Sequence, residues 1–120
     1  MSVRLQKIES LIKEELSLII LYKMRDPIFG FLTLTKVKVT PDTKIAKIYI
    51  SSYEKEKRQA ILQKLQSVKG FLRTELAKKV SLRAVPDLEF FIDDTSDYVE
   101  KMEILFKMIH ENDSKKPEQN

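Results

Sequence analysis

Apolar residues near the N-terminus recur at intervals of three and four positions, which is the spacing of one face of an α-helix. The positions concerned are Leu5, Ile8, Ile12, Leu16 and Ile19. Charged residues separate them, and Ser2 stands where a helix N-cap is expected. Because a residue that precedes proline disfavours helical dihedral angles, this helix should end before Asp26-Pro27. The pattern predicts one long amphipathic helix.

Two segments after this helix alternate between β-favouring residues and lysines, as half-buried strands do. They run from Leu32 to Thr40 and from Ile45 to Ser51, and Pro41-Asp42-Thr43 between them is typical of a turn. In the first segment the apolar alternation changes phase near Thr35-Lys36, which indicates a β-bulge. We expect the two segments to pair as an antiparallel hairpin.

A second helical stripe occupies the middle of the chain and contains a glycine. Ser51-x-x-Glu54 has the spacing of a capping box, and helical periodicity continues from there to about residue 80. The apolar positions are Ile61, Leu65, Val68, Leu72, Leu76 and Val80. Glycine inside a helix costs about 1 kcal/mol relative to alanine, so Gly70 suggests a kink, a helix end or a close backbone approach. This stretch is either one kinked helix or two consecutive helices.

The last third of the chain predicts a strand and a helix. Leu88 to Ile92 is aromatic and β-rich. A helix capped by Thr95, Ser96 or Asp97 follows, with apolar residues at Tyr98, Met102, Leu105 and Ile109. Residues 112–120 are polar and predicted to be disordered, so residues 1–111 should form the domain. The order α-β-β-α-α-β-α predicts a two-layer α+β domain, a three-stranded sheet covered by helices on one face, which several unrelated functions share.

Composition excludes several classes of protein. The absence of cysteine rules out a disulfide framework and a thiolate metal site. The longest apolar run, Leu16 to Tyr22, is interrupted at Ser17 and is far shorter than the roughly 18 residues of a membrane span. Met1 to Arg4 lacks the pattern of a signal peptide. We expect a cytoplasmic protein that does not enter a membrane.

Residues that could perform catalysis are scarce. The single histidine, His110, lies near the end of the last predicted helix. Four serines lie at helix starts, in the kink or before a strand, where local hydrogen bonding explains them: Ser51, Ser52, Ser67 and Ser81. With Gly30 and Gly70 as the only glycines, the chain has no Walker-type or dinucleotide-binding loop. We therefore expect a protein that is not an enzyme.

Three aspartates are the best candidates for metal ligands. Asp93, Asp94 and Asp97 offer the carboxylate oxygens that Mg²⁺ prefers, so a metal-dependent nuclease is one alternative. The interpretation that we favour is a strand end followed by negative charge at a helix N-terminus, where the helix dipole stabilises it. No metal or other cofactor is predicted.

Charge is distributed unevenly along the chain. The net charge of +4 is a weak indication by itself, but it is +3 over residues 1–54, +7 over residues 55–83 and −6 over residues 84–120. The basic middle can neutralise several phosphates and would then make binding strongly salt-dependent. A solvated helix face is the alternative explanation.

Gly70 favours the RNA-binding interpretation. It lies between Lys69 and Arg73, where the missing side chain would let a phosphate or sugar approach backbone N–H groups at a helix start. Alternatively, Gly70 lets two helices cross. The predicted RNA-binding residues are Lys69, Gly70 and Arg73 in the first rank and Lys64, Lys78, Lys79 and Arg83 in the second, and Lys36, Lys38 and Lys47 of the hairpin could extend this set. A protein-only adaptor, whose acidic last helix from Asp93 to Glu111 docks a basic partner, is the competing binding function.

Five motifs in order resemble those of the ribosome-binding factor A family. They are Asp26-Pro27-x-x-Gly30-Phe31-x-Thr33-x-Thr35, Val37-x-Val39-x-Pro41-Asp42, Ala46-Lys47-Ile48-Tyr49-Ile50-Ser51, Gly70-Phe71-Leu72-Arg73 and Leu82-Arg83-x-x-Pro86-x-Leu88-x-Phe90-x-x-Asp93. The resemblance spans about residues 3 to 110. No single motif decides it, but their order and spacing are specific.

The resemblance implies a type-II K-homology-like fold without the usual GxxG loop, so the four-nucleotide clamp of ordinary K-homology domains is not expected. The family has an Ala-x-Gly helix kink, to which Val68-Lys69-Gly70 corresponds here. Valine departs from that pattern and stiffens the backbone because it is β-branched. The resemblance also implies a monomeric protein whose function is to bind ribosomal RNA of the small ribosomal subunit without catalysis. It acts in late maturation of that RNA and leaves before translation begins.

Overall fold

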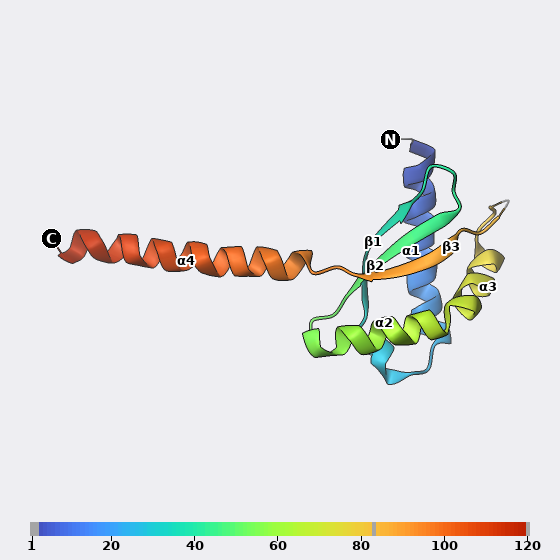
Figure 1. The fold of residues 1–120 in the computed structure, drawn as a ribbon, viewed down its shortest axis with the longest axis horizontal. Helices are drawn as coiled ribbons and strands as arrows, with labels where there is room; N and C mark the ends of the chain where they lie inside the picture. Colours follow the sequence, from blue (N-terminus) through green and yellow to red (C-terminus); the bar gives the residue numbers. More distant parts are fainter. Residues whose placement is uncertain (1–2, 83, 120) are drawn as a thin grey trace.

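The computed structural model describes residues 3–82 and 84–119, with side chains omitted at residues 96 and 111–119. Four α-helices, two short 3₁₀ helices and three strands follow one another in this part of the chain (Figure 1). In order they are α1 (Val3–Lys23), η1 (Pro27–Phe31), β1 (Thr33–Val39), β2 (Ile45–Ser51), η2 (Lys55–Lys57), α2 (Arg58–Ser67), α3 (Lys69–Lys79), β3 (Asp87–Ile92) and α4 (Thr95–Gln119). The predicted helices and strands are confirmed, and η1 and η2 were not predicted.

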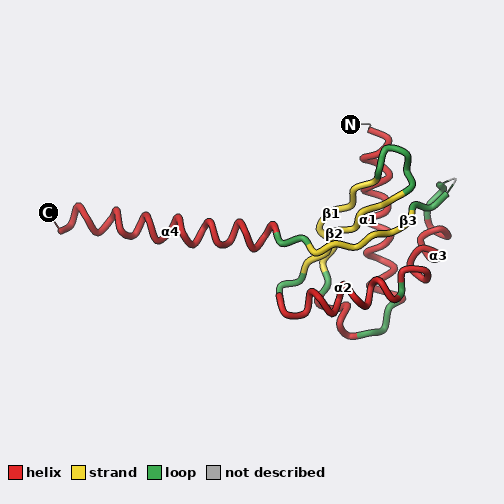
Figure 2. Tube along the Cα trace, in the orientation of Figure 1, coloured by secondary structure: helices red, strands yellow, loops and turns green. Residues whose placement is uncertain are grey.

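The sheet has the order β1-β2-β3, with β1 and β2 antiparallel and β2 and β3 parallel. Helices α1, α2 and α3 pack on one of its faces, while α4 leads away from the sheet (Figure 2). The α2–α3 pair is the connection that a parallel pair of strands requires. The predicted two-layer α+β architecture is therefore confirmed, and β1 and β3 are its two edges.

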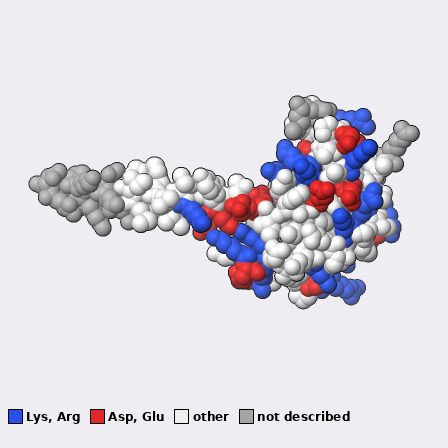
Figure 3. Space-filling model, in the orientation of Figure 1, with Lys and Arg blue, Asp and Glu red and all other residues white. Residues whose placement is uncertain are grey.

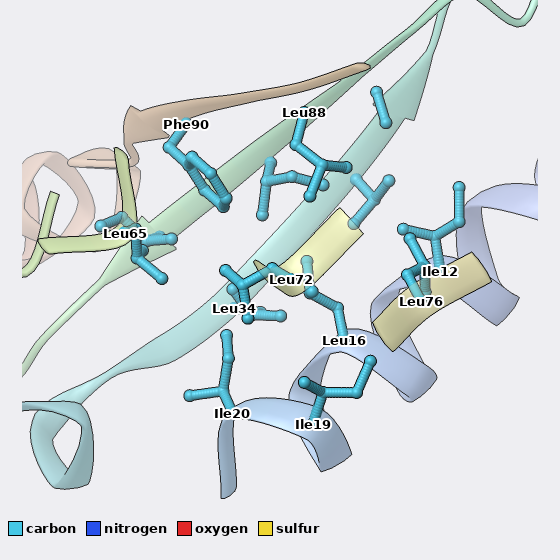
Figure 4. Packing of buried hydrophobic residues seen from close by; sticks show 14 of the residues in the cluster. Ile12, Leu16, Ile19, Ile20, Leu34, Leu65, Leu72, Leu76, Leu88 and Phe90 are labelled. Carbon is cyan, nitrogen blue, oxygen red and sulfur yellow. The ribbon is translucent and has the colours of Figure 1, made fainter. Parts of the chain in front are cut away.

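Side chains from both layers fill one hydrophobic core between the sheet and the helices (Figure 4). In α1 the predicted stripe is buried, with Ile12 and Leu16 fully enclosed. The sheet contributes Leu34, Val37, Val39, Ala46, Ile48, Ile50, Leu88 and Phe90. These residues alternate with polar or aromatic ones along each strand, so the opposite face of the sheet remains open to solvent.

The predicted β-bulge lies in β1, where the pairing with β2 shifts register between Leu34 and Lys36. Without the extra residue, Leu34 and Val37 would point to opposite faces of the sheet, because side chains alternate along a strand. The bulge resets this alternation, so both residues are buried on the core side. The change of phase in the sequence therefore had the physical cause that was predicted.

The buried carboxylate of Glu9 connects α1 to the sheet edge. Its Oε2 accepts a hydrogen bond of 2.8 Å from the backbone N–H of Val39, at the end of edge strand β1. A buried backbone donor without a partner would cost about 1–3 kcal/mol. Glu9 is therefore a structural residue, although the helical pattern had grouped it with the exposed charges of α1.

The middle of the chain forms two helices, which confirms the second of the two predicted alternatives. The break lies at Val68, whose φ of −108° and ψ of 13° are not helical, and not at Gly70, which lies inside α3. The predicted capping box is wrong, because Ser51 ends β2 and α2 begins only at Arg58 after η2. The Ser52 hydroxyl instead accepts a hydrogen bond from the Glu54 N–H.

Helix α4 projects from the body of the molecule formed by the elements from α1 to β3 (Figure 1). It is helical to Gln119 and so continues past residue 111, where we had placed the end of the domain. The boundary at 111 and the disorder of residues 112–120 stay predictions. Within residues 3–82 and 84–119, no helix combines the length and the apolar character that crossing a membrane requires.

Candidate nucleic-acid interface

The predicted RNA-binding residues that the structure describes follow one another along α2 and α3. We call them the basic ridge, and it consists of Lys64, Lys69, Gly70, Arg73, Lys78 and Lys79. Arg83 lies outside the described residues. Helix α2 carries Lys64 in its last turn, and the other five residues lie on α3, so the break at Val68 separates the two parts of the ridge.

Lys69 and Gly70 form the first turn of α3. A Cβ atom built on Gly70 would meet no atom within 4 Å, so the space beside this backbone is open. No described residue packs against this position, and the explanation that glycine permits a helix crossing therefore does not hold. What remains is an accessible backbone at the start of a helix, next to a lysine, which is an arrangement suited to anions.

A hollow of about 250 Å³ adjoins Lys69 at the β3 edge of the sheet. It is lined by Gln66, Lys69, Leu88, Glu89, Phe90 and Phe91. The Lys69 ammonium lies 3.9 Å from Asp87 Oδ1, a long contact between two solvent-accessible side chains. Such pairs contribute little and exchange readily with other partners, so Lys69 can turn toward a phosphate.

Arg73 is exposed, but its guanidinium is engaged with the backbone before β3. Its Nη2 donates a hydrogen bond of 2.8 Å to the Val85 carbonyl, and its Nε donates one of 3.3 Å to the Pro86 carbonyl. These bonds fix the segment that leads into β3 against α3. The side chain retains its positive charge, because its partners are neutral, but its position is set by the fold.

Two other cations of the ridge are paired with carboxylates. Lys64 lies 3.3 Å from Asp26 Oδ2, and Lys78 lies 2.7 Å from Glu75 Oε2. Glu75 also binds Lys23 at 2.6 Å, and hydrogen bonds from Lys23 and then Lys78 lower the pKa of this carboxyl to about 2. Lys79 differs from the other lysines of the ridge. No carboxylate of the described residues lies within 4 Å of its ammonium group.

The visible face of the body carries lysine and arginine side chains interspersed with aspartate and glutamate (Figure 3). Clustering along the sequence therefore overstates the positive field. Arg58 illustrates this difference: it belongs to the basic segment but is buried. It donates to both oxygens of Asp97 and to the Ser52 carbonyl, and the hydrogen bonding to Asp97 raises the pKa of the guanidinium.

Two of the three aspartates that were candidate metal ligands, Asp93 and Asp97, have side-chain partners within the protein. Asp93 accepts hydrogen bonds from the Thr35 hydroxyl (2.6 Å) and the Thr95 N–H (2.9 Å), which lower its pKa to about 2. Asp97 is bound by Arg58, which lowers its pKa as well. In the part of the chain that is described, no three His, Cys, Asp or Glu side chains are placed to share a metal ion. Asp93 and Asp97 join α4 to the body.

The open face of the sheet carries aromatic residues that the sequence analysis did not identify as functional. Tyr49 of β2 and Phe91 of β3 stack with ring centroids 5.5 Å apart, and the Lys36 ammonium lies 4.5 Å from the Tyr49 centroid. The available signal was their alternation with core residues, Tyr49 between Ile48 and Ile50 and Phe91 after Phe90. That alternation places both rings on the face opposite to the core.

Comparison with known families now identifies the chain. Residues 4–106 match the family model described as ribosome-binding factor A. The chain belongs to the ribosome-binding factor A family. A relative from Thermodesulfovibrio yellowstonii, itself named ribosome-binding factor A, is 42% identical over 106 residues, which cover 88% of this chain and 90% of the relative. The resemblance inferred from the five motifs is thus confirmed.

Solved structures of the family share the fold. The crystal structure of ribosome-binding factor A from Thermus thermophilus has a TM-score of 0.67 at 26% identity and covers 73% of this chain and 93% of its own. A second structure is a homology model of the Thermus thermophilus factor fitted into a cryo-electron-microscopy map of a 30S complex of that factor. Its TM-score is 0.64 at 27% identity, and it covers 74% of this chain and 94% of its own. The K-homology-like α+β class is therefore the fold of this chain.

Proposed function

We propose that this protein is a cytoplasmic, monomeric ribosome-binding factor that acts in small-subunit assembly by binding ribosomal RNA without catalysis. The observation that carries the proposal is the family match over residues 4–106, which includes the body apart from its first residue, Val3. It is supported by the Thermus thermophilus family member, whose homology model was fitted into a map of a 30S complex. The partners we propose are ribosomal RNA of the small subunit and the immature small-subunit particle.

The contact begins at the first turn of α3. Gly70 leaves its backbone accessible, and Lys69 next to it has only a long contact to Asp87. Lys79, at the other end of α3, has no carboxylate within 4 Å in the described part of the chain. Phosphate oxygens can therefore approach the backbone N–H groups of the first turn beside Lys69, and Lys79 can neutralise a second phosphate at the other end of the helix. Lys64 and Lys78 join this contact by exchanging their carboxylate partners for phosphates, whereas Arg73 mainly holds the segment before β3.

Binding of this kind acts on subunit maturation by shifting a conformational equilibrium. A protein that binds one conformation of the maturing particle more tightly than another increases the population of the first by its difference in affinity. Late maturation of the RNA then proceeds from the stabilised conformation. The factor leaves before translation begins, because the mature conformation no longer offers the same affinity.

The first test uses Gly70→Ala. Because space beside Gly70 is open and its φ is not positive, alanine should fit and should raise the free energy of unfolding by up to about 1 kcal/mol. Affinity for immature small subunits, measured by cosedimentation at several salt concentrations, should nevertheless fall, since the methyl group hinders the approach of a phosphate. A variant that is more stable and binds equally well would exclude Gly70 from the interface.

A second test removes charge from the ridge. Lys69→Ala combined with Lys79→Ala should weaken binding and flatten the slope of log affinity against log salt by about 1.5 to 2, if each lysine neutralises one phosphate. The matched control is Lys7→Ala with Lys13→Ala, two exposed lysines on α1. Equal slopes for the ridge variant and this control would reject the proposed contact.

A protein-only adaptor is the second candidate function, and the exposure of α4 favours it. Apolar side chains of α4, including Met102 and Leu105, are about half exposed and available to a protein partner. Digesting the ribosomal RNA of the particle separates the two candidates. Loss of cosedimentation after digestion supports RNA binding, whereas retention on the isolated ribosomal proteins supports the adaptor.

A further inference from the structure

We infer that the open face of the sheet is a second RNA contact, which stacks an unpaired base on Phe91, itself supported by Tyr49, and holds a phosphate between Lys38 and Lys47. This surface lies on the face of the sheet opposite to α1, α2 and α3, so it is separate from the basic ridge. That the polymer is RNA and not DNA rests on the proposed function. The stacking surface itself rests on the geometry of the sheet.

The aromatic row crosses all three strands. Lys36, Tyr49 and Phe91 are direct neighbours, since Lys36 pairs with Tyr49 and Tyr49 pairs with Phe91 in the sheet register. The two rings stack face to face with an inclination of 30°, and the Lys36 ammonium lies over the Tyr49 ring from the other neighbouring strand. The ring of this pair that a base can reach is therefore Phe91, which is 39% exposed, and we call the stacked pair the platform. Unpaired bases stack on such platforms, whereas bases inside a duplex cannot reach them.

The next row along the strands carries charge. Lys38 pairs directly with Lys47, and Lys47 pairs with Glu89. Like charges directly opposite each other destabilise a sheet, and among the described residues neither lysine has a carboxylate within 4 Å. An anion between the two ammonium groups would remove this repulsion. The two rows are two residues apart, about 7 Å along the strand, so a base on the platform places its phosphate near the lysines.

Nearby carboxylates offset part of this charge, but a positive excess remains. Asp93, just beyond the end of β3, stays ionised, because hydrogen bonds from Thr35 and Thr95 lower its pKa to about 2, and its charge also interacts with Lys36. Asp87 faces Lys69 at the β3 edge. Glu89, which pairs with Lys47, and Asp93 thus stand against Lys36, Lys38 and Lys47, which leaves an excess of one positive charge. The platform therefore attracts an anionic strand more strongly than a neutral or acidic peptide.

Phe91 also provides a physical link to the basic ridge. Besides stacking on Tyr49, it lines the hollow beside Lys69 at the same edge of the sheet. Because β3 is an edge strand, no further strand separates the hollow from the open face. A single-stranded segment can thus pass from the start of α3 over the β3 edge and onto the platform.

The test measures binding of a short single-stranded RNA of mixed sequence, with the same sequence as a duplex for comparison. Tyr49→Val with Phe91→Val keeps β-favouring residues but removes the rings, and it should lower affinity for the single strand about five- to hundredfold. Lys38→Gln with Lys47→Gln should flatten the salt slope by about 0.7 for the one phosphate held between them. The control is Tyr53→Val, because Tyr53 is fully exposed outside the sheet.

The outcomes separate this inference from the proposed function. If the ring variant and Tyr53→Val bind the single strand equally, the platform is rejected, even where binding to subunits still depends on Lys69 and Lys79. Preference for the duplex, or crosslinks from this face to ribosomal protein, would also overturn it. If the double ring variant does not fold, the test uses NMR chemical shifts of the unaltered protein. Adding the single-stranded RNA should shift the signals of Tyr49 and Phe91, and unchanged signals would reject the platform.

Discussion

Helices α1 and α4 carry similar apolar stripes, but the structure buries only one of them. In α1, Ile12 and Leu16 are fully enclosed between the sheet and α3, whereas in α4 Met102 and Leu105 are 50% and 52% exposed. Helical periodicity states which residues share a face. The comparison shows that it does not state whether that face meets another element of the same chain.

The difference follows from how each helix is connected. Helix α1 lies along the helical layer and packs on β1 and α3. Helix α4 begins directly after β3 and is joined to the body near its start, by Arg58 and Lys55 with Asp97 and by Asp93 with Thr35. These contacts direct α4 away from the sheet (Figure 1), and the described apolar side chains of α4, such as Met102 and Leu105, stay about half exposed.

The largest expected effect comes from truncating one leucine in each helix. Leu16→Ala should lower the free energy of unfolding by about 2–5 kcal/mol, because it removes buried methyl groups and leaves a cavity. Leu105→Ala should change it by less than about 0.5 kcal/mol. Chemical denaturation measures both. A large loss for Leu105→Ala would mean that α4 is packed in solution, either on the body or on another copy of the chain.

Removing the carboxylate of Glu9 should have an intermediate effect. Glu9→Ala leaves the backbone N–H of Val39 without its acceptor, which should cost about 1–3 kcal/mol. Glu14→Ala, on the exposed side of the same helix, should change stability by less than about 0.5 kcal/mol. If the two variants were equally stable, the hydrogen bond between α1 and the sheet edge would make no net contribution to the free energy of unfolding.

Lowering the pH should gradually decrease the unfolding free energy of the body. Glu75 and Asp93 have folded-state pKa values of about 2, below their ordinary values of 4.5 and 3.8, so the unfolded chain binds more protons in this range. Their contribution to stability is complete above about pH 5 and is lost as pH falls toward 2. Unfolding free energies measured between pH 6 and pH 2 should therefore decline less steeply for Glu75→Gln with Asp93→Asn. Parallel pH profiles for the variant and the unaltered protein would contradict this account.

The smallest effect is expected for a chain that ends at Glu100. It keeps Asp97 and its bond to Arg58 but lacks most of α4, so the unfolding free energy should change by less than about 0.5 kcal/mol. Amide hydrogen exchange of the full chain provides an independent check, because α4 amides should exchange much faster than those of α1. Slow exchange along α4 would show that its apolar face is covered.

Several features of the fold were predictable because they depend on neighbours in sequence. The bulge near Thr35 produced a visible change of alternation, and the residue before Pro27 marked the end of α1. The capping box at Ser51 failed because β2 extended through that residue and used it in strand pairing. The helix break occurred at Val68 and not at Gly70, because the glycine fits an ordinary helical position in α3.

The candidate site was predictable as a segment but not residue by residue. Sequence clustering identified the ridge, yet it counted Arg58, which is buried, and gave Arg73 the same rank as Lys69. The stacking of Tyr49 and Phe91 could not be inferred, because it requires knowing that β3 pairs with β2 in parallel.

By itself, the sequence determined the helices, the strands, the bulge and the family, because periodicity and ordered motifs are local properties of the chain. Only the tertiary structure decided which helix is covered, which charges are neutralised and which rings meet. Those outcomes depend on partners such as Arg58 with Asp97, Lys23 with Glu75 and Tyr49 with Phe91. Each pair lies tens of residues apart, and the free energy of a charge or an apolar surface is set by the partner that folding places beside it.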